Sequence, residues 1–342
     1  MTTRILLSIL ISFMLFSCGG EVEQPKSTEK NTKDSLELAR TLDFEQINNE
    51  LKNDHNNPSL YIKRARIYQK YNDNLLAIED IDRAIKLDSL MPEYYLLKAE
   101  LQKKEGGYAD AKRTLDKCLL IDNKNVQARI ELGWIAFIIQ NYKQAIEYAD
   151  AALKINVYAA EAYYLKGMIF SEQKDTAKAI SSFITATEQE SNYYDAFIQL
   201  GVLHLNQKNK LAIDYFKNAV NIKPKSSEAL YNYAFANQQF GNYTEAITTY
   251  QNMIAIQPFR EPYFNLGYIH QEYLDKPEEA IEFYNQAVQL SPFYHQAYYN
   301  RGLCYEKVGD FKNAELDFRK TLSIASDYDL AALSLERVLK RK

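Results

Sequence analysis

Histidine, cysteine and carboxylate side chains carry much of enzyme chemistry, and this sequence holds four histidines and three cysteines. Active sites built on such residues have recognisable spacings, including glycine-rich phosphate loops, paired-histidine metal motifs, Cys-x-x-Cys and Gly-x-Ser-x-Gly. None of these motifs occurs in the sequence. We interpret His204 and His270 as core residues of two segments that are not neighbours, and Glu278 and Glu279 fall on a predicted turn or exposed helix face. We therefore predict no enzyme activity, no cofactor and no metal site.

Cys18 has the clearest chemistry of its own, because of the segment that precedes it. Arg4 gives a short positive start, and residues 5–16 form an apolar run that is too short to span a bilayer. The sequence around the cysteine resembles the lipobox of bacterial lipoproteins: Leu15-Phe16-Ser17-Cys18-Gly19-Gly20. The resemblance implies a signal peptide over residues 1–17 and acylation of Cys18, whose several lipid chains anchor stably. The alternative is an ordinary secretory signal followed by a mature chain that happens to contain a cysteine.

The segment after Cys18 predicts where such an anchor places the protein. Gly19 carries no charge, which by the enterobacterial sorting rule favours the outer membrane and leaves its periplasmic and surface faces both open. Residues 18–34 are rich in Glu, Lys, Thr and Ser, so they predict a disordered tether. Residues 35–57 predict an amphipathic leading cap helix or half-repeat that ends at the breaker Asn56-Asn57-Pro58.

The composition indicates a well-packed helical protein. The chain is 46% hydrophobic and 25% charged, with only 11 glycines and 8 prolines. Its formal net charge of -4 comes from acidic and basic residues that are interspersed along the chain. This pattern predicts no nucleic-acid partner, since phosphate-binding surfaces are basic.

Small residues recur along most of the chain at a fixed period. One series of alanines is spaced by 34 residues, with a single step of 33: Ala77, Ala111, Ala145, Ala179, Ala212, Ala246, Ala280 and Ala314. A second small series precedes it: Ala65, Ala99, Gly133, Gly167, Gly201, Ala234, Gly267 and Gly302. Such internal repetition predicts an array of equal structural units.

The physical reason for both series is close approach. Two antiparallel helices joined by a short turn pack backbone to backbone only where neither carries a large side chain. Aromatic residues four positions after the alanine, such as Phe183 and Phe216, are predicted to fill the remaining core. Cys118 and Cys304 lie at positions that need a small apolar residue and are too far apart in the array to pair, so we interpret them as core residues.

The pattern resembles the tetratricopeptide repeat (TPR) family, whose unit carries a large residue, Leu-Gly, an aromatic, a later Ala, a second aromatic and Pro. The seventh repeat has nearly all of them: Tyr263, Leu266-Gly267, His270, Ala280, Tyr284 and Pro292. The second and third repeats depart most, with Gln102 and Ala136 where an aromatic is usual. The resemblance implies an all-α, right-handed superhelical solenoid of antiparallel helix pairs, with eight repeats over residues 58–328 and a C-terminal capping helix over residues 329–342.

In this family the first helix of each repeat lines the concave surface, so its outward residues are the candidates for partner binding. In repeats three to five these residues are mostly apolar: Ile130, Trp134, Phe137, Tyr164, Met168, Ile198, Val202 and Leu205. In repeats six to eight they are aromatic residues interleaved with asparagines: Tyr231, Asn232, Phe235, Phe264, Asn265, Tyr268, Tyr299 and Asn300. A contiguous apolar strip of this length predicts an interaction surface.

The three asparagines occupy the same place in successive repeats. They are similar to the asparagine ladder with which some family members hold a peptide backbone, since an amide offers one acceptor and two donors. The alternative is that asparagine is simply common at this place. The family's clamp for peptide C-termini needs lysine at a position where this chain has only Ile, Leu, Tyr and Phe, so we predict no such clamp.

These features together predict a non-enzymatic scaffold or adaptor, anchored at the cell envelope by Cys18, that captures a peptide or helical segment of a partner protein in the concave groove. The alternative is a surface glycan-binding lipoprotein, because 27 tyrosines and 16 phenylalanines could stack on sugars. Glycan-binding relatives of this architecture carry long insertions, whereas no repeat here is lengthened by more than one residue.

Overall fold

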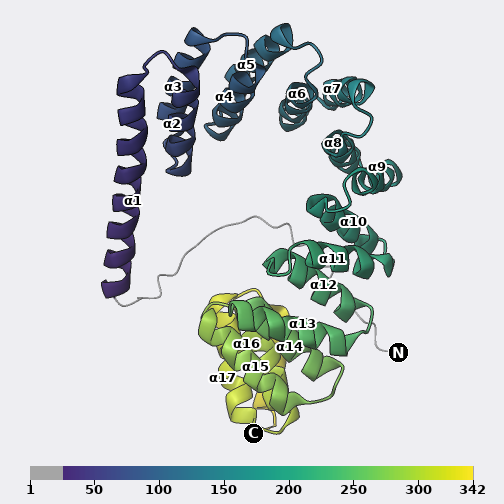
Figure 1. Ribbon diagram of the computed structural model, residues 1–342. Coiled ribbons are helices and arrows are strands. Elements are labelled where there is room, and N and C mark those ends of the chain that lie inside the picture. The colour runs from purple at the N-terminus through teal and green to yellow at the C-terminus, as the bar shows by residue number, and fades with distance from the viewer. Residues whose placement is uncertain (1–25, 342) are drawn as a thin grey trace. The chain divides into compact units, whose positions relative to one another are not determined.

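The computed structural model describes residues 26–341, with side chains from residue 37 onward. Over this range the chain forms eighteen helices and no strand, so the predicted all-α class is confirmed (Figure 1). The predicted signal peptide, Cys18 and the first part of the tether lie outside the described residues. The helices group into two compact units, α1 to α5 and α6 to α18, which divide between Ile121 and Asp122.

The helices of the first unit are α1 (Lys26–Asn53), α2 (Pro58–Lys70), α3 (Asn74–Leu87), α4 (Pro92–Lys104) and α5 (Tyr108–Ile121). The helices of the second unit are α6 (Val126–Ile138), α7 (Tyr142–Ile155), α8 (Ala160–Glu172), α9 (Thr176–Gln189), α10 (Tyr194–Asn206), α11 (Leu211–Ile222), α12 (Ser227–Gln239), α13 (Tyr243–Ile256), α14 (Arg260–Glu272), α15 (Pro277–Leu290), α16 (His295–Lys307), α17 (Phe311–Ile324) and α18 (Asp329–Leu339).

Helices α2 to α17 form eight antiparallel pairs, from pair 1 (α2 and α3) to pair 8 (α16 and α17), and the two helices of a pair lie side by side (Figure 1). Within each unit, contacts beyond a pair run to the next helix in the chain. Within the second unit they also run between successive first helices, as in α6 with α8, α10 with α12, and α14 with α16. The first helices of this unit therefore make a continuous row.

The seam of each pair is the line where its two helices touch, and it is built as the small-residue series predicts. Ala77, Ala179 and Ala212 have no exposed surface. A Cβ atom added to Gly167 would lie 2.5 Å from the ring of Phe183, and one added to Gly201 would lie 2.4 Å from the ring of Phe216. These distances are far inside van der Waals contact, so the seam requires glycine at these positions.

The turn inside each pair contains one residue with positive φ: Asn72 (61°), Gly106 (77°), Gln140 (60°), Lys174 (60°), Lys208 (55°), Gly241 (82°), Asp275 (56°) and Gly309 (86°). This left-handed conformation ends the first helix and reverses the chain, and it suits glycine best. Lys174 and Lys208 adopt it at a cost of about 1 kcal/mol each. The eight turns therefore share one backbone conformation, although the residue type at the left-handed position differs among them.

Helix α1 begins at Lys26, which corrects the predicted start at Ser35 and places residues 26–34 in a helix rather than in the disordered tether. Those residues include no glycine or proline. Ile47 and Leu51 anchor the C-terminal half of α1 on α2. Once this half is helical, each further residue toward the N-terminus gains a backbone hydrogen bond at little cost, so the helix extends beyond its packed part.

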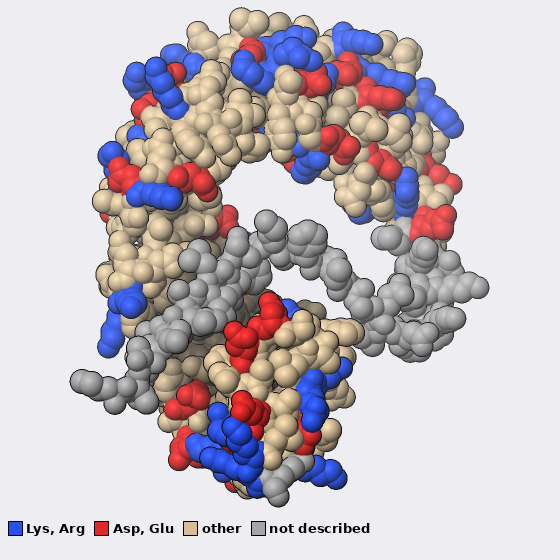
Figure 2. Space-filling model, turned by 180° about the vertical axis from the view of Figure 1, so that it is seen from behind, with Lys and Arg blue, Asp and Glu red and all other residues tan. Residues whose placement is uncertain are grey.

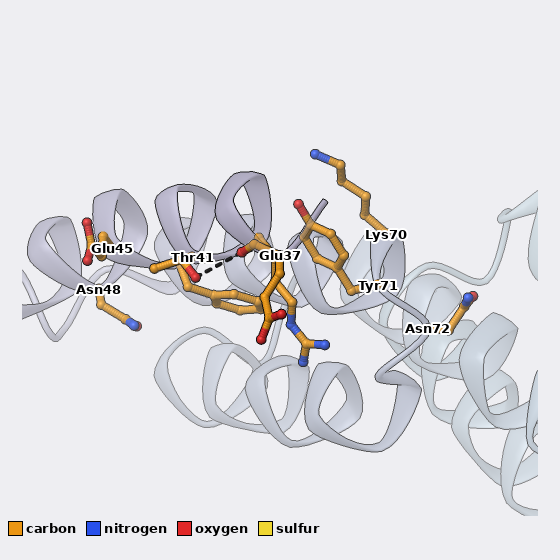
Figure 3. Close-up of a pocket in the computed structure, with 9 residues that line it drawn as sticks. Glu37, Thr41, Glu45, Asn48, Lys70, Tyr71 and Asn72 are labelled. Atoms are coloured by element: carbon orange, nitrogen blue, oxygen red, sulfur yellow. Dashed lines mark hydrogen bonds between the residues drawn. The ribbon is translucent and has the colours of Figure 1, made fainter. Parts of the chain in front are cut away.

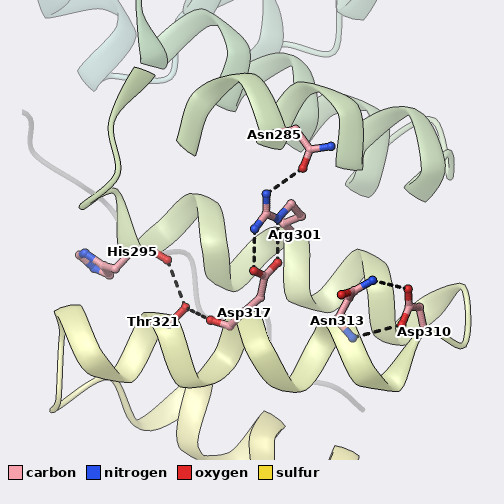
Figure 4. Close-up of polar contacts among 7 residues, drawn as sticks. All are labelled: Asn285, His295, Arg301, Asp310, Asn313, Asp317 and Thr321. Atoms are coloured by element: carbon pink, nitrogen blue, oxygen red, sulfur yellow. Dashed lines mark hydrogen bonds and ion pairs between the residues drawn. The ribbon is translucent and has the colours of Figure 1, made fainter. Parts of the chain in front are cut away.

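An arginine network shows what α1 does for the first pair. Arg64 on α2 donates through Nε and Nη2 to Asp80 on α3, at 2.6 and 2.7 Å, and through Nη1 to Asn48 on α1, at 2.8 Å. Pair 8 repeats the arrangement: Arg301 on α16 bonds Asp317 on α17 at 2.7 and 2.6 Å and Asn285 on α15 at 2.7 Å (Figure 4).

In pair 8 the asparagine belongs to the second helix of the preceding pair. By this equivalence α1 takes the place of a second helix in front of pair 1.

Helix α18 covers the end of pair 8 through Leu335 and Val338, which pack near Phe318. Leu330 and Leu333 on the same helix are 53% and 60% exposed, because they lie away from its buried side, which Ala331, Ser334 and Val338 form. Cys118 and Cys304 are both buried in the core and are not joined by a disulfide, as predicted.

Charged side chains of both signs alternate over the face of the molecule drawn in Figure 2. This mixed distribution agrees with the interspersed charges of the sequence.

Candidate protein-binding surface

Each first helix has a buried side that packs in the seam and a partly exposed side. The partly exposed side carries the residues predicted to line the groove and is called the outer face below. In α6, Leu132 and Gly133 turn toward the seam and are buried, which leaves Trp134 and Phe137 on the half-buried opposite side. The Trp134 and Phe137 rings meet edge to face with centroids 5.6 Å apart, and the Trp134 ring is 5.9 Å from that of Tyr164 on α8. Trp134 Nε1 also donates to Glu161 Oε1, at 3.1 Å. The predicted residues of pairs 3 and 4 therefore form one aromatic patch across two helices.

Met168 lies one turn after Tyr164 and is half-buried, as are Val202 and Leu205 on α10. Ile130 and Ile198, in contrast, are only 2% and 5% exposed, which corrects their prediction as open groove residues. Ile130 packs between α6 and the next pair, against Ala152 and Ala162. The side chain at this place thus packs against two successive pairs. The exposed apolar strip therefore contains fewer residues than predicted.

Aromatic residues continue the outer face in pairs 6 to 8. Tyr231 and Phe235 on α12 are stacked, with centroids 6.1 Å apart and planes 5° from parallel. Tyr268 on α14 meets Tyr273 edge to face at 5.9 Å. Phe264 and Tyr299, on α14 and α16, each contact the buried aromatic of their own pair, at 5.7 and 5.9 Å. The five predicted rings, those of Tyr231, Phe235, Phe264, Tyr268 and Tyr299, are half-buried. Part of each ring is therefore fixed by packing while another part remains exposed.

The three predicted asparagines are not equivalent. Asn265 is only 7% exposed, and its Nδ2 donates to the Tyr231 hydroxyl at 3.4 Å. Asn232 and Asn300 are half-buried. The structure therefore corrects the prediction of three like amides open to a peptide: Asn265 links successive first helices instead, because the position beside the seam glycine turns toward the preceding pair.

A column of carboxylates along the same helices was missed at the level of sequence. It occupies the second residue of four successive first helices: Glu161, Asp195, Glu228 and Glu261. The helix dipole favours a carboxylate near the start of any helix. A single acidic residue there is therefore ordinary and does not by itself indicate a column. The signal that could have found the column is its spacing, since each carboxylate lies six residues before a member of the second small series: Gly167, Gly201, Ala234 and Gly267.

These carboxylates lie close to the aromatic row. Burial, with smaller contributions from Asp195 and Glu228, raises the pKa of Tyr164 to about 12. Burial similarly raises the pKa of Tyr231, with Glu261 contributing. Both phenols therefore stay neutral and able to donate hydrogen bonds at neutral pH. The surface offers aromatic area, hydroxyl donors and negative charge, which together suit binding rather than catalysis.

A pocket of 720 Å³ in the first unit lies between α1 and the end of α2 (Figure 3). Its two basic side chains are already paired: Arg40 bonds Asp73 at 2.6 Å, and Lys70 bonds Asp43 at 2.7 Å, as does the Tyr71 hydroxyl at 2.9 Å. The Thr41 hydroxyl donates to the Glu37 carbonyl at 2.9 Å. This pocket is accordingly a hollow in an ion-paired helix contact.

The histidines take the core positions predicted for them, since His204 and His270 are each 7% exposed. Across the described residues, no group of three or more His, Cys, Asp or Glu side chains is placed to hold a metal ion. Within the same range, none of the helices combines the length and apolar content that crossing a membrane requires.

Family models described as tetratricopeptide repeat or TPR repeat match residues 96–160, 131–195, 228–259, 275–309 and 295–328. Tetratricopeptide repeat protein 6 of Homo sapiens is 28% identical over 210 residues, which are 60% of this chain and 40% of that protein. Protein O-mannosyl-transferase TMTC3 of Homo sapiens is 26% identical over 220 residues, which are 59% of this chain and 24% of that protein. The chain thus spans less than half the length of these curated relatives.

Among solved structures, the chain is similar to YrrB, described as a TPR protein with an unusual peptide-binding site, at 25% identity and a TM-score of 0.38. The match covers 54% of this chain and 95% of the solved one.

Proposed function

Since the chain belongs to the tetratricopeptide repeat family, whose members generally act as protein-interaction scaffolds, we propose that it is a non-enzymatic adaptor that holds a partner protein on the outer face of its first helices. The observation that carries the proposal is the aromatic patch across α6 and α8. Trp134, Phe137 and Tyr164 are fixed by mutual contacts at 5.6 and 5.9 Å and are still partly exposed. Preordered aromatic area of this kind is what concentrates binding energy at protein interfaces.

The proposed partner is a peptide or helical segment of an envelope protein. The support for the envelope is the sequence around Cys18, whose chemistry would fix one end of the chain to a membrane. In this proposal Cys18 is acylated and the protein is held at the outer membrane. Replacing Cys18 by Ser should move it from the membrane fraction to the soluble fraction, and unchanged membrane association would contradict the anchor.

The binding face is tested by crosslinked affinity capture from the native envelope, with partners identified by mass spectrometry. The variant carries Trp134→Ser and Phe137→Ser, which remove the patch. The matched control is Phe293→Ser, because Phe293 is 77% exposed in the turn between α15 and α16, outside the outer face. Circular dichroism checks that each variant keeps its helical content.

We expect one defined protein to be captured by the unaltered chain and by the Phe293 variant, and to be lost from the patch variant. Capture of polysaccharide without any protein would instead favour the glycan-binding alternative. Capture of the same protein by all three forms would place the binding site elsewhere.

A further inference from the structure

Three aromatic pairs recur at one place in the second unit, where the fifth residue of a first helix meets the residue just before the next first helix. These junction pairs are Tyr164–Tyr193, Phe264–Tyr294 and Tyr299–Tyr328, and in each the ring centroids are 5.1 Å apart. The planes of the two rings are 34°, 44° and 63° apart, so the three junctions share a ring distance at equivalent positions but not one ring orientation.

At two junctions, the first residue of the first helix contacts the second ring of the pair, over its face for Arg260 and edge to face for His295. Arg260 opens α14, and its guanidinium carbon lies 4.8 Å from the centroid of the Tyr294 ring. The same side chain bonds Glu261 through Nε at 2.8 Å and the Ser291 hydroxyl through Nη1 at 3.1 Å. His295 opens α16 and meets the Tyr328 ring at 5.4 Å. A nitrogen-bearing side chain of the protein itself thus occupies both places.

At the third junction the equivalent residue is Ala160, which opens α8 and has no side chain that reaches the Tyr193 ring. A hollow of 460 Å³ adjoins this position, lined by Ala160, Glu161 and Glu190 together with polar side chains such as Gln127 and Gln189. The chain therefore keeps the aromatic pair and the carboxylate of the filled junction while omitting the cation.

The negative charge around the hollow is not balanced by the chain. Glu161 accepts hydrogen bonds from Trp134 Nε1 and Gln127 Nε2, both at 3.1 Å, and these donors are neutral. Among the described residues, no lysine or arginine forms an ion pair with Glu161, Glu190 or Asp195. Two of these carboxylates face one hollow without a counter-ion, so the site is complementary to a positive group.

The position of Glu190 supports this complementarity. It is the C-cap residue that directly follows α9, where the helix dipole disfavours a negative charge. Burial is the main cause that raises the pKa of the Tyr193 phenol, and Glu161, Asp195 and Glu190 contribute to the same shift. The Tyr193 phenol and these carboxylates are therefore close enough to interact electrostatically. A cation in the hollow would reduce the repulsion between the negative charges.

Resting on the proposed function, we propose that the hollow at the start of α8 receives an arginine side chain of the bound partner protein, held by the carboxylates of Glu161 and Glu190 that line it and extending toward the neighbouring Tyr193 ring. Arginine suits the site because a planar guanidinium stacks on an aromatic face and bonds carboxylates through two or more N–H groups. The protein's own Arg260 supplies the model, with a ring and a carboxylate contacting one guanidinium.

The test measures fluorescence anisotropy of the full chain with labelled pools of random peptides that share one fixed central residue. The fixed residue is Arg in one pool and citrulline, which has the same shape without the charge, in the other. Three variants are compared with the unaltered chain. Glu161→Gln with Glu190→Gln removes the charge, Ala160→Arg fills the hollow as Arg260 fills its own junction, and Glu188→Gln is the matched control on the exposed side of α9.

We expect the unaltered chain and the Glu188 control to bind the arginine pool about tenfold more tightly than the citrulline pool. The charge-removal and filled variants should bind both pools equally. Equal binding of both pools by the unaltered chain, with loss of binding in the Trp134 and Phe137 variant, would overturn the arginine site and leave the proposed function standing. Failure of every pool to bind the unaltered chain would count against both.

Discussion

The seam of each helix pair and the outer face of its first helix lie on opposite sides of the same helix, and they tolerate change very differently. At the seam, Gly167 and Gly201 leave no room for a single added carbon atom. On the outer face, Met168 and Val202 are the next residues along the chain and are only half-buried. The difference indicates that the seam determines the fold, whereas the outer face can be varied to suit a partner.

The largest expected effect is at the seam. Gly201→Val would force its side chain into the Phe216 ring, which already lies 2.4 Å from the position of an added Cβ. We expect a loss of about 3 kcal/mol or more in the free energy of unfolding. Urea denaturation followed by circular dichroism measures it, with Val202→Ala as the neighbouring control on the outer face. Equal losses in the two variants would remove the distinction between the two sides.

A buried histidine sharpens the comparison, because two seams carry one at the same place. Neither ring nitrogen of His204 has a hydrogen-bond partner in the described part of the chain. Nδ1 of His270 donates to the Leu266 carbonyl at 2.8 Å. Removing an unsatisfied buried polar group should stabilise, so we expect His204→Phe to gain about 1–2 kcal/mol and His270→Phe to gain nothing.

The gain from His204→Phe should depend on pH. Burial lowers the pKa of His204 in the folded state, so below about pH 6.5 the unfolded chain takes up the proton more readily and folding stability falls. The Phe variant lacks this loss, and its advantage should therefore grow from pH 7.5 to pH 5.5. A constant difference in urea midpoint over that interval would show that proton binding at His204 contributes nothing.

A smaller effect is expected at a turn that closes the seam. Lys174 has a φ of 60°, in a conformation that glycine adopts freely. Lys174→Gly should raise stability by about 0.5–1 kcal/mol, because relief of backbone strain exceeds the added entropy of the unfolded chain. Thermal melts of this variant and of Gly241→Ala, which introduces the opposite change at an equivalent turn, should shift in opposite directions.

The smallest effect on folding is expected on the outer face. Met168→Gln replaces a half-buried apolar side chain by a polar one of similar length and should change stability by about 0.5 kcal/mol or less. Partner capture should nevertheless weaken, since the change removes apolar area beside Tyr164. A large loss of stability without loss of capture would reverse the roles assigned to the two sides.

The sequence was sufficient for the seam and insufficient for the outer face, for a physical reason. A seam depends on residues within one period, so the series from Ala77 to Ala314 predicts it directly. The exposure of Ile130, Ile198 and Asn265 depends on how closely one first helix approaches the next, and one period contains no information about that distance. The Arg64 network was likewise missed, because Asn48 and Asp80 lie a half-period before and after it and have no apolar pattern to reveal them.

The two arginine networks have a consequence for assembly. An array of similar repeats risks misfolding by docking a helix pair against the wrong neighbour, since every seam offers much the same apolar shape. Pairs 5 and 7 have leucine at the equivalent place, Leu200 and Leu266. An apolar side chain there can pack against the wrong neighbouring helix as readily as against the right one. A guanidinium that must find one carboxylate on its own pair and one amide on the preceding helix discriminates among neighbours. We therefore expect the networks of Arg64 and Arg301 to disfavour an incorrectly ordered array at its first and last pairs.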